Sequence, residues 1–315
     1  MKGTGSHYNL VGRGSKKKTK SKKQHTPDYY QVQRKIPLGT TDAAQGHLGG
    51  TTVGDCGKIL SIANRRLYRY GNNYRMKIDL DPSVANTAAF DVEVFALRNT
   101  WDVQRAYALA KKVYDEAYEE ELDRTGSANV ARWRDFRVRD GVTGAIQLHP
   151  CVYDNATLAL SVTDDGEFIN SAVDDAGTEK TFTWGVAGGS VIDIKTEWIQ
   201  AGRTGADPNV ISTSAPYAGV NSDNMSDIEM GNLGGDGNNP PYSQDALSDQ
   251  LVCVATLRYE PAPDGMQRLS TGFFDAPCGL FVLKTTAGVN TSNGNYVLTV
   301  QGGDYKGVMA HAMSQ

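Results

Sequence analysis

The sequence predicts an all-β protein, an eight-stranded jelly-roll sandwich with one inserted long α-helix at about 102–125 and with long loops. Many short segments rich in β-branched and aromatic residues are separated by turn residues, and glycine is abundant at 34 of 315 residues. Only one segment shows the apolar spacing of a long helix. A jelly roll fits these observations because its eight strands form two sheets whose ends tolerate long loops.

Ten segments have the composition of β-strands. Residues 90–97 have the clearest pattern, because alternate apolar side chains from Phe90 to Ala96 share one face, and period-two alternation is typical of a half-buried strand. Residues 58–70 are interpreted as the first strand of the body. The predicted strands are 58–70, 74–80, 90–97, 133–139, 157–162, 181–184, 191–199, 251–259, 280–284 and 296–300.

Residues 102–125 break the β pattern. Their apolar residues recur at spacings of three and four, which predicts an amphipathic helix. Asp102 is a candidate N-cap, and Gly126 is a candidate stop. Since this helix stands alone among strands, we expect it to be an insertion in one connection. Its apolar positions are Val103, Ala106, Ala110, Val113, Tyr114, Ala117 and Leu122.

The charge pattern divides the chain. Residues 1–35 contain ten Lys or Arg residues and one acid, Asp28, whereas the whole chain has a formal net charge of −4. We therefore predict a disordered basic arm at 1–28, an extended arm or transition at 29–56, and a jelly-roll shell domain at 57–315. Residues 202–250 are rich in Gly, Asn, Asp, Ser and Pro and are expected to form a long surface loop within that domain.

The basic arm is the strongest functional signal. Lys and Arg displace counterions from phosphates, so we predict that the arm neutralises nucleic acid without reading its sequence. A nuclear localisation signal or a solubility tail is the alternative. The arm residues are Arg13, Lys16, Lys17, Lys18, Lys20, Lys22 and Lys23, continued by Arg34 and Lys35.

A second basic group follows in the predicted first strand pair, on the face from which we expect the arm to leave. Ordinary surface charge is its alternative interpretation. The group contains Arg65, Arg66, Arg69, Arg75 and Lys77, of which the first three complete the predicted nucleic-acid-binding set.

Other chemistry has little support, and we expect no enzyme activity. The five histidines lie in tail or loop contexts without a triad pattern, and no nucleotide-binding fingerprint occurs in its required setting. Four dispersed cysteines are interpreted as buried free thiols. No cofactor is expected, although acidic pairs such as Asp79 with Asp81 could bind calcium at subunit contacts. No signal peptide or membrane span is predicted.

This organisation resembles the capsid proteins of small icosahedral viruses. A Lys/Arg arm from Arg13 to Lys23, a transition, and a strand-rich body with long loops are most similar to capsid proteins of circular Rep-encoding single-stranded DNA viruses, bacilladnavirus-like or circovirus-like. The arm is Lys-rich, whereas circovirus arms are strongly Arg-rich. RNA-virus capsids of nodavirus-like or tombusvirus-like type would share the same features.

The resemblance implies a self-assembling shell subunit. The expected partners are 60 or more copies of the chain and a single-stranded viral genome, with an unknown host receptor and no membrane. The expected locations are the virion and, during assembly, the host nucleus or cytoplasm. Two other hypotheses remain: a cellular nucleic-acid-binding β domain with a basic tail, and a glycan-binding or glycan-active β-sandwich protein.

Overall fold

The computed structural model places a strand-rich body within a unit that spans Val32–Gln315. The described residues are 31–40, 50–82, 89–125, 134–142, 145–153, 156, 160–163, 172–173, 179–185, 191–198, 251–260, 269–285 and 294–313. The expected disordered arm at 1–28 and the expected long loop at 202–250 lie outside them.

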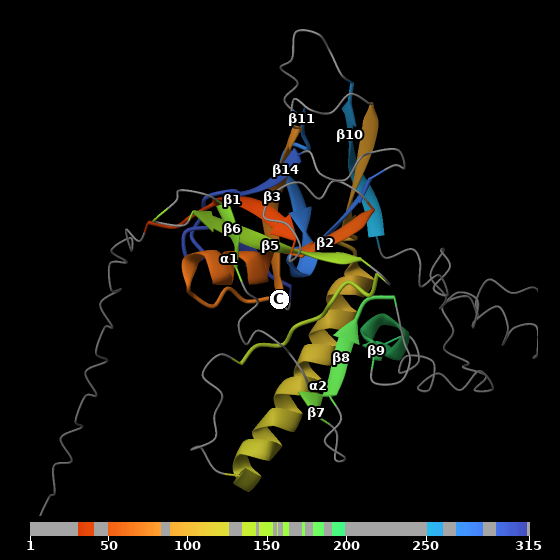
Figure 1. The fold of residues 1–315 in the computed structure, drawn as a ribbon. Coiled ribbons are helices and arrows are strands. Elements are labelled where there is room, and N and C mark those ends of the chain that lie inside the picture. Colours follow the sequence, from red (N-terminus) through yellow and green to blue (C-terminus); the bar gives the residue numbers. More distant parts are fainter. Residues whose placement is uncertain are drawn as a thin grey trace, which may run out of the picture. The chain divides into compact units, whose positions relative to one another are not determined.

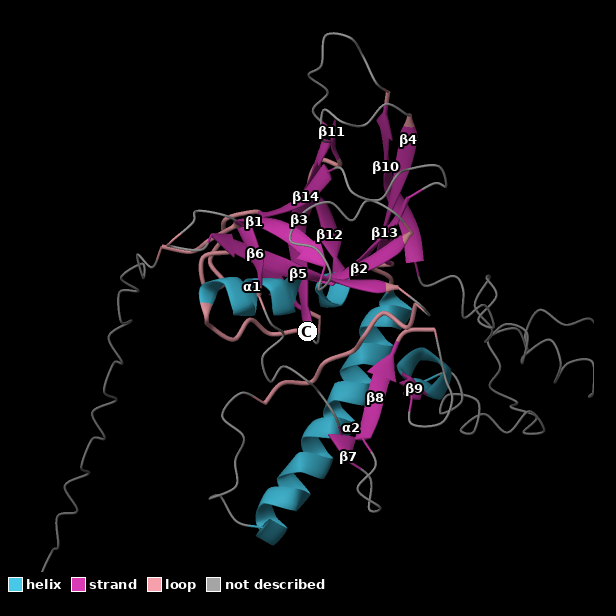
Figure 2. Cartoon of the chain, in the orientation of Figure 1, coloured by secondary structure: helices cyan, strands magenta, loops and turns pink. Residues whose placement is uncertain are grey.

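The body is all-β, with few helices (Figures 1 and 2). Its helices are α1 (Cys56–Asn64), α2 (Trp101–Thr125) and the short 3-10 turn η3 (Pro277–Gly279). Its strands are β1 (Lys35–Thr40), β2 (Thr51–Asp55), β3 (Asn72–Pro82), β4 (Phe90–Leu97), β5 (Ile146–Tyr153), β6 (Leu160–Val162), β7 (Ala172–Val173), β8 (Glu179–Thr183), β9 (Val191–Asp193), β10 (Leu251–Tyr259), β11 (Leu269–Ser270), β12 (Phe274–Ala276), β13 (Leu280–Thr285), β14 (Gly294–Val300) and β15 (Ala310–Ala312).

Most of these strands belong to one curled sheet with two antiparallel sets. In the first set, β14 pairs with β1 and β3, and β11, β12 and β15 pair with the other edge of β3. The second set has the order β2-β13-β4-β10. Strand β5 joins the sets, because it is antiparallel to β1 and parallel to β2, and β6 extends β5. A smaller sheet contains β7, β8 and β9.

Both strand sets contribute to one buried core. The alternation predicted for 90–97 is confirmed, because Phe90, Val92 and Val94 of β4 are all buried. They belong to the same cluster as Ile78 of β3 and Leu298 of β14. The buried side chains of both strand sets therefore pack in a shared interior.

The predicted long helix is confirmed as α2, which lies between β4 and β5 in the chain. Its inner face packs in a second buried cluster, where Tyr107 contacts Phe136 at a ring-centroid separation of 5.4 Å. Asp102 lies inside the first turn rather than before it, and its carboxylate pairs with Lys195 at 3.2 Å. Met313, the last described residue, also belongs to this second cluster, where its sulfur contacts Cys278.

The predicted strand at 58–70 is wrong, because α1 and a following loop occupy this segment. Asp55 caps the helix, since its carboxylate accepts a hydrogen bond from the Lys58 backbone N–H at 3.0 Å. Cys56, Ile59 and Leu60 then place their side chains in the core at helical spacing. The aromatic and leucine residues that suggested a strand lie mostly after the helix has ended.

Three further boundaries differ from the sequence predictions. The expected transition at 29–56 contributes β1 and β2 to the sheet, so the strand-built body begins before residue 57. Residues 134–138 form no strand, because the side chain of Phe136 packs under α2. Strand β9 ends at Asp193, whose carboxylate caps a helical turn at 194–198 by accepting hydrogen bonds from Lys195 and Thr196. Strands β1, β2, β5, β7, β11, β12 and β15 were not predicted.

Close packing between β2 and β13 gives a test of this core. Gly54 lies opposite Phe281, and a Cβ atom on Gly54 would lie 2.1 Å from the ring Cζ. We predict that Gly54→Ala lowers the free energy of unfolding by about 1–3 kcal/mol, measured by urea denaturation. Gly54→Ala/Phe281→Leu should lose less than the sum of the two single substitutions, because the smaller side chain removes the clash. Additive losses would contradict this packing.

Candidate nucleic-acid interface

The end of α1 positions two predicted site residues. Arg65 adopts a left-handed conformation with φ of 49°, and its N–H donates to the Ile62 carbonyl at 3.3 Å. The Arg66 N–H donates to the Ser61 carbonyl at 3.1 Å, which completes the C-terminal cap. The helix therefore ends abruptly, and Arg65 is exposed immediately beyond it.

Tyrosine hydroxyls hold the loop after α1 in place. The Tyr68 hydroxyl donates to the Lys306 carbonyl at 3.0 Å, and the Arg69 N–H donates to the Tyr305 hydroxyl at 3.0 Å. The Tyr74 hydroxyl donates to the Arg69 carbonyl at 2.6 Å. Neutral groups therefore make several of the contacts that fix this loop.

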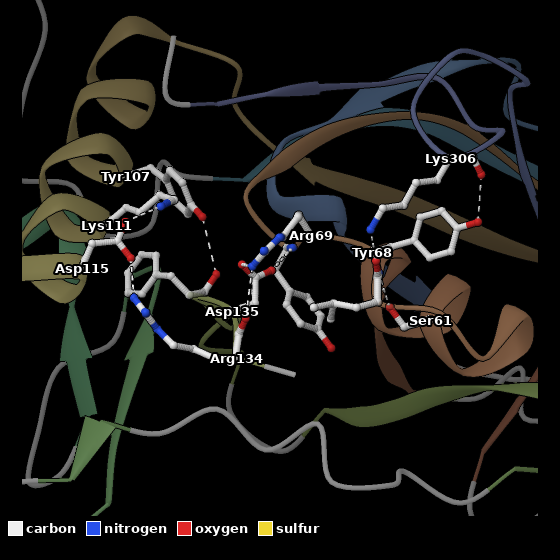
Figure 3. Close-up of polar contacts among 12 residues, drawn as sticks. Ser61, Tyr68, Arg69, Tyr107, Lys111, Asp115, Arg134, Asp135 and Lys306 are labelled. Atoms are coloured by element: carbon white, nitrogen blue, oxygen red, sulfur yellow. Dashed lines mark hydrogen bonds and ion pairs between the residues drawn. The ribbon is translucent and has the colours of Figure 1, made fainter. Parts of the chain in front are cut away.

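The opposing partner is a tight turn near the carboxyl end of the chain. Tyr305 and Val308 exchange backbone hydrogen bonds across Lys306 and Gly307, whose φ angles are 49° and 88°. Positive φ at both central residues is the geometry of a type I′ turn. The Lys306 ammonium group donates to the Leu67 carbonyl, which ties the turn to the loop after α1 (Figure 3).

Lys306 brings a cation that the sequence analysis did not identify. Its Nζ lies 5.8 Å from the ring centroid of Tyr68 and 5.4 Å from that of Tyr305, within cation–π range. Burial lowers the pKa of Lys306, and the positive charges of Arg66 and Arg69 lower it further. The effect of these charges indicates that the three cations lie within electrostatic reach of one another.

The start of the body enters beside this turn. The Gln33 N–H donates to the Asn64 side-chain oxygen at 2.8 Å, and the Asn64 amide donates back to the Gln33 carbonyl at 3.1 Å. Arg34 packs against Gly302, where an added Cβ would lie 1.9 Å from a guanidinium nitrogen. The chain therefore enters the body between the end of α1 and residues 301–307.

Arg69 has a structural partner, so its charge is partly neutralised. Its guanidinium pairs with the Asp135 carboxylate at 2.9 Å, and that carboxylate also accepts the Tyr70 N–H at 2.8 Å (Figure 3). The Arg69 side chain is 53% exposed, whereas that of Asp135 is 7% exposed. Arg69 therefore both anchors residues 134–135 to the loop and keeps part of its guanidinium accessible.

We use the name basic cluster for five residues at this end of the body. They come from the residue before β1, the loop that follows α1 and the Tyr305–Val308 turn, and they are Arg34, Arg65, Arg66, Arg69 and Lys306. Four of them were predicted from the sequence to bind nucleic acid, but Arg65, Arg66 and Arg69 lie after a helix rather than in a strand pair.

The remaining predicted cations fall outside this cluster. Lys35 is exposed at the start of β1. Arg75 lies 3.5 Å from Asp275 and Lys77 lies 3.0 Å from Asp79, so acids already oppose these two charges. The arm residues are outside the described part of the chain and are Arg13, Lys16, Lys17, Lys18, Lys20, Lys22 and Lys23.

One buried ion pair is structural rather than part of the basic cluster. Arg137 pairs with Asp55 at 3.2 Å, and both side chains are almost fully buried. Burial raises the pKa of Asp55, against the opposing effect of Arg137. The Arg137 guanidinium also lies 4.9 Å from the ring centroid of Tyr70. This pair therefore connects the N-cap of α1 to residues 134–142.

In the part of the chain that the structure describes, the cysteines and acids give no second site. All four cysteines are free, but the prediction that all are buried is wrong, because Cys253 on β10 is exposed. Burial raises the pKa of Cys151 to about 11, which keeps it as a thiol at neutral pH. Within the described ranges, no three His, Cys, Asp or Glu side chains gather in a metal-binding group. None of the helices described is both long and apolar enough to cross a membrane.

The electrostatic coupling in the basic cluster can be measured through Lys306. We predict that Arg66→Gln raises the pKa of Lys306, because a neighbouring positive charge that disfavours the ammonium form is removed. NMR titration of isotope-labelled lysines, assigned with Lys306→Arg, would report it. Arg75→Gln is the matched control and should leave the pKa of Lys306 unchanged. A Lys306 pKa that is insensitive to Arg66 would show that the cluster is not coupled.

Comparisons with known proteins add no relative to this geometry. No protein-family model, no curated protein and no solved structure matches the chain.

Proposed function

We propose that this protein is the capsid subunit of a small icosahedral virus, that it acts structurally rather than as an enzyme, and that it packages a single-stranded genome. The observation that carries the proposal is the position of the basic cluster. Arg34, Arg65 and Arg66 lie where the chain enters the body, and the 33 residues before Arg34 contain eight Lys or Arg residues. The arm and the basic cluster therefore both supply positive charge for binding phosphates.

Strand order supports a jelly roll for the shell domain. The chain alternates between the two sets: β1 in the first, β2 in the second, β3 in the first, β4 and β10 in the second, β12 in the first, β13 in the second and β14 in the first. The spatial orders β1-β14-β3-β12 and β2-β13-β4-β10 are those required of eight strands in two Greek keys. Helices α1 and α2 and strand β5 would then be additions to that framework.

Charge supports the packaging role. The first 35 residues carry a formal charge of about +9, and the rest of the chain carries about −13. Sixty copies would supply roughly 540 positive charges and 180 copies roughly 1600, on the scale of a single strand of about a kilobase. An acidic remainder disfavours binding of the same strand elsewhere on the body.

One observation favours a second candidate, a cellular nucleic-acid-binding β domain with a basic tail. Such a protein should carry a basic face on its body, and the basic cluster is a face of this kind. However, the Tyr68 side chain, which lies beside Lys306 of the basic cluster, is fully buried, so it provides no platform for stacked bases. The two candidates differ in self-assembly, because only the capsid subunit forms closed particles.

Salt-dependent binding tests the cluster. We predict that Arg34→Gln/Arg65→Gln/Arg66→Gln weakens binding of a fluorescent single-stranded oligonucleotide, measured by anisotropy. The slope of log K against log salt should fall in magnitude by about 2, because each lost phosphate contact removes about 0.7 for single strands.

A matched triple variant controls for net charge. Arg75, Arg258 and Lys284 each lie within 4 Å of an acid, at 3.5, 2.9 and 3.7 Å respectively. Replacing all three with Gln removes the same formal charge and should change the slope little. Equal effects of the two triple variants would show that binding senses only net charge and that the cluster is no interface.

Deleting the arm separates folding from packaging. We expect the protein without residues 1–25, which include eight Lys or Arg residues, to keep its circular dichroism spectrum and melting temperature. Its assemblies should lose nuclease-protected nucleic acid, measured as the absorbance ratio at 260 and 280 nm, because most of the positive charges of the arm are gone. An equally long Gly/Ser arm controls for length. Unchanged nucleic-acid content, or loss of the fold, would refute the assigned role of the arm.

A further inference from the structure

One face of α2 remains exposed after the helix has packed on the body. Leu109 is 41% exposed and Val113 is 57% exposed, although both are apolar. Ala117, one turn later, is exposed as well. Spacings of four residues place the three side chains along one side of the helix, whereas the buried Tyr107 lies on another side. The second core therefore leaves an apolar stripe uncovered.

The charges that flank this stripe are segregated along the helix. Arg105 and Lys112 lie toward its amino-terminal half, and Glu116 and Glu120 lie toward its carboxyl-terminal half. All four side chains are exposed, and only Lys112 and Glu116 are close to each other, at 3.6 Å. The same face is thus basic at one end, apolar in the middle and acidic at the other end.

We propose that this face of α2 is a contact between two copies of the chain, formed by antiparallel pairing of two α2 helices about a twofold axis near Val113. This inference rests on the proposed function, because it assigns one of the contacts by which the shell would be built. A twofold contact places the same patch on both subunits, so the patch must complement itself.

Antiparallel pairing satisfies that requirement. With the axis at Val113, the two Val113 side chains face each other, and Leu109 of each copy faces Ala117 of the other. Arg105 of one copy then lies near Glu120 of the other, and Lys112 lies near Glu116. A parallel pairing would instead place like charges opposite each other, which opposes association.

The same features argue against the other possible occupants of this face. Nucleic acid would meet the exposed Glu116, Glu119 and Glu120 beside the apolar stripe and would be repelled. An unrelated protein would need a matching succession of basic, apolar and acidic groups. A second copy supplies that succession without any further assumption.

Cross-linking of the full-length protein tests the contact. Cys253→Ser removes the exposed native thiol, and Val113→Cys in that background places one thiol beside the proposed axis. A short bis-maleimide should link this variant into covalent dimers. Lys284→Cys, exposed on β13, is the matched control and should give little dimer. Circular dichroism melting would verify that each variant folds.

Charge reversal supplies the second arm of the test. In the Val113→Cys background, Arg105→Glu/Lys112→Glu and Glu116→Lys/Glu120→Lys should each lower dimer yield by about tenfold or more, because like charges then face each other. Combining all four substitutions should restore the yield, and so should mixing the two double variants.

Particle formation, measured by sedimentation on the same samples, separates this inference from the proposed function. Particles without a Val113-specific dimer, or a dimer yield that is indifferent to charge reversal, would overturn the α2 contact and leave the capsid proposal standing. Charge-sensitive dimers without particles would support the contact and count against the capsid proposal. Monomers in every sample would overturn both.

Discussion

Pairing of β1 with β14 on one side and β5 on the other is the interaction on which the arrangement of the basic residues depends. It fixes the first strand of the body inside the sheet rather than along its surface. The reciprocal hydrogen bonds between Gln33 and Asn64 then join the segment before β1 to the end of α1. As a result, the chain enters the body beside Arg65, Arg66 and Lys306, and charges far apart in the sequence become neighbours.

An ion pair and neutral hydrogen bonds hold the basic cluster in place. Like charges repel, so a cluster of this kind needs compensation from nearby acids or from a rigid scaffold. Here Asp135 compensates Arg69, while hydroxyl and carbonyl groups of Tyr68, Tyr305 and their neighbours fix the backbone. Neutral hydrogen bonds therefore help to hold the geometry of the basic cluster. Buried pairs such as Asp55 with Arg137 instead use their charges internally, since removing either partner would leave an uncompensated buried ion.

Sequence periodicity predicted the helix and the strands whose apolar pattern lies within the element itself. Phe90 to Leu97, Leu251 to Tyr259 and the long helix after Trp101 were found at or near their correct bounds. Helix α1 was missed because it is short and its cap depends on the Asp55 side chain, while leucine and tyrosine residues follow it. Lys306 could not be found, since only contacts across more than 230 residues bring it to the loop after α1. Long-range pairing likewise sets the register of β1 with β14 and of β2 with β13. Composition alone suggested that these two strands were part of an arm.

We propose that the body assembles with its own copies. We also propose that the basic arm and the basic cluster bind the genome. Both halves of this claim depend on self-assembly. The most direct measurement is a negative-stain electron micrograph of the purified full-length protein at low salt. The account predicts closed particles of uniform diameter. A monodisperse monomer at high concentration under the same conditions would contradict it.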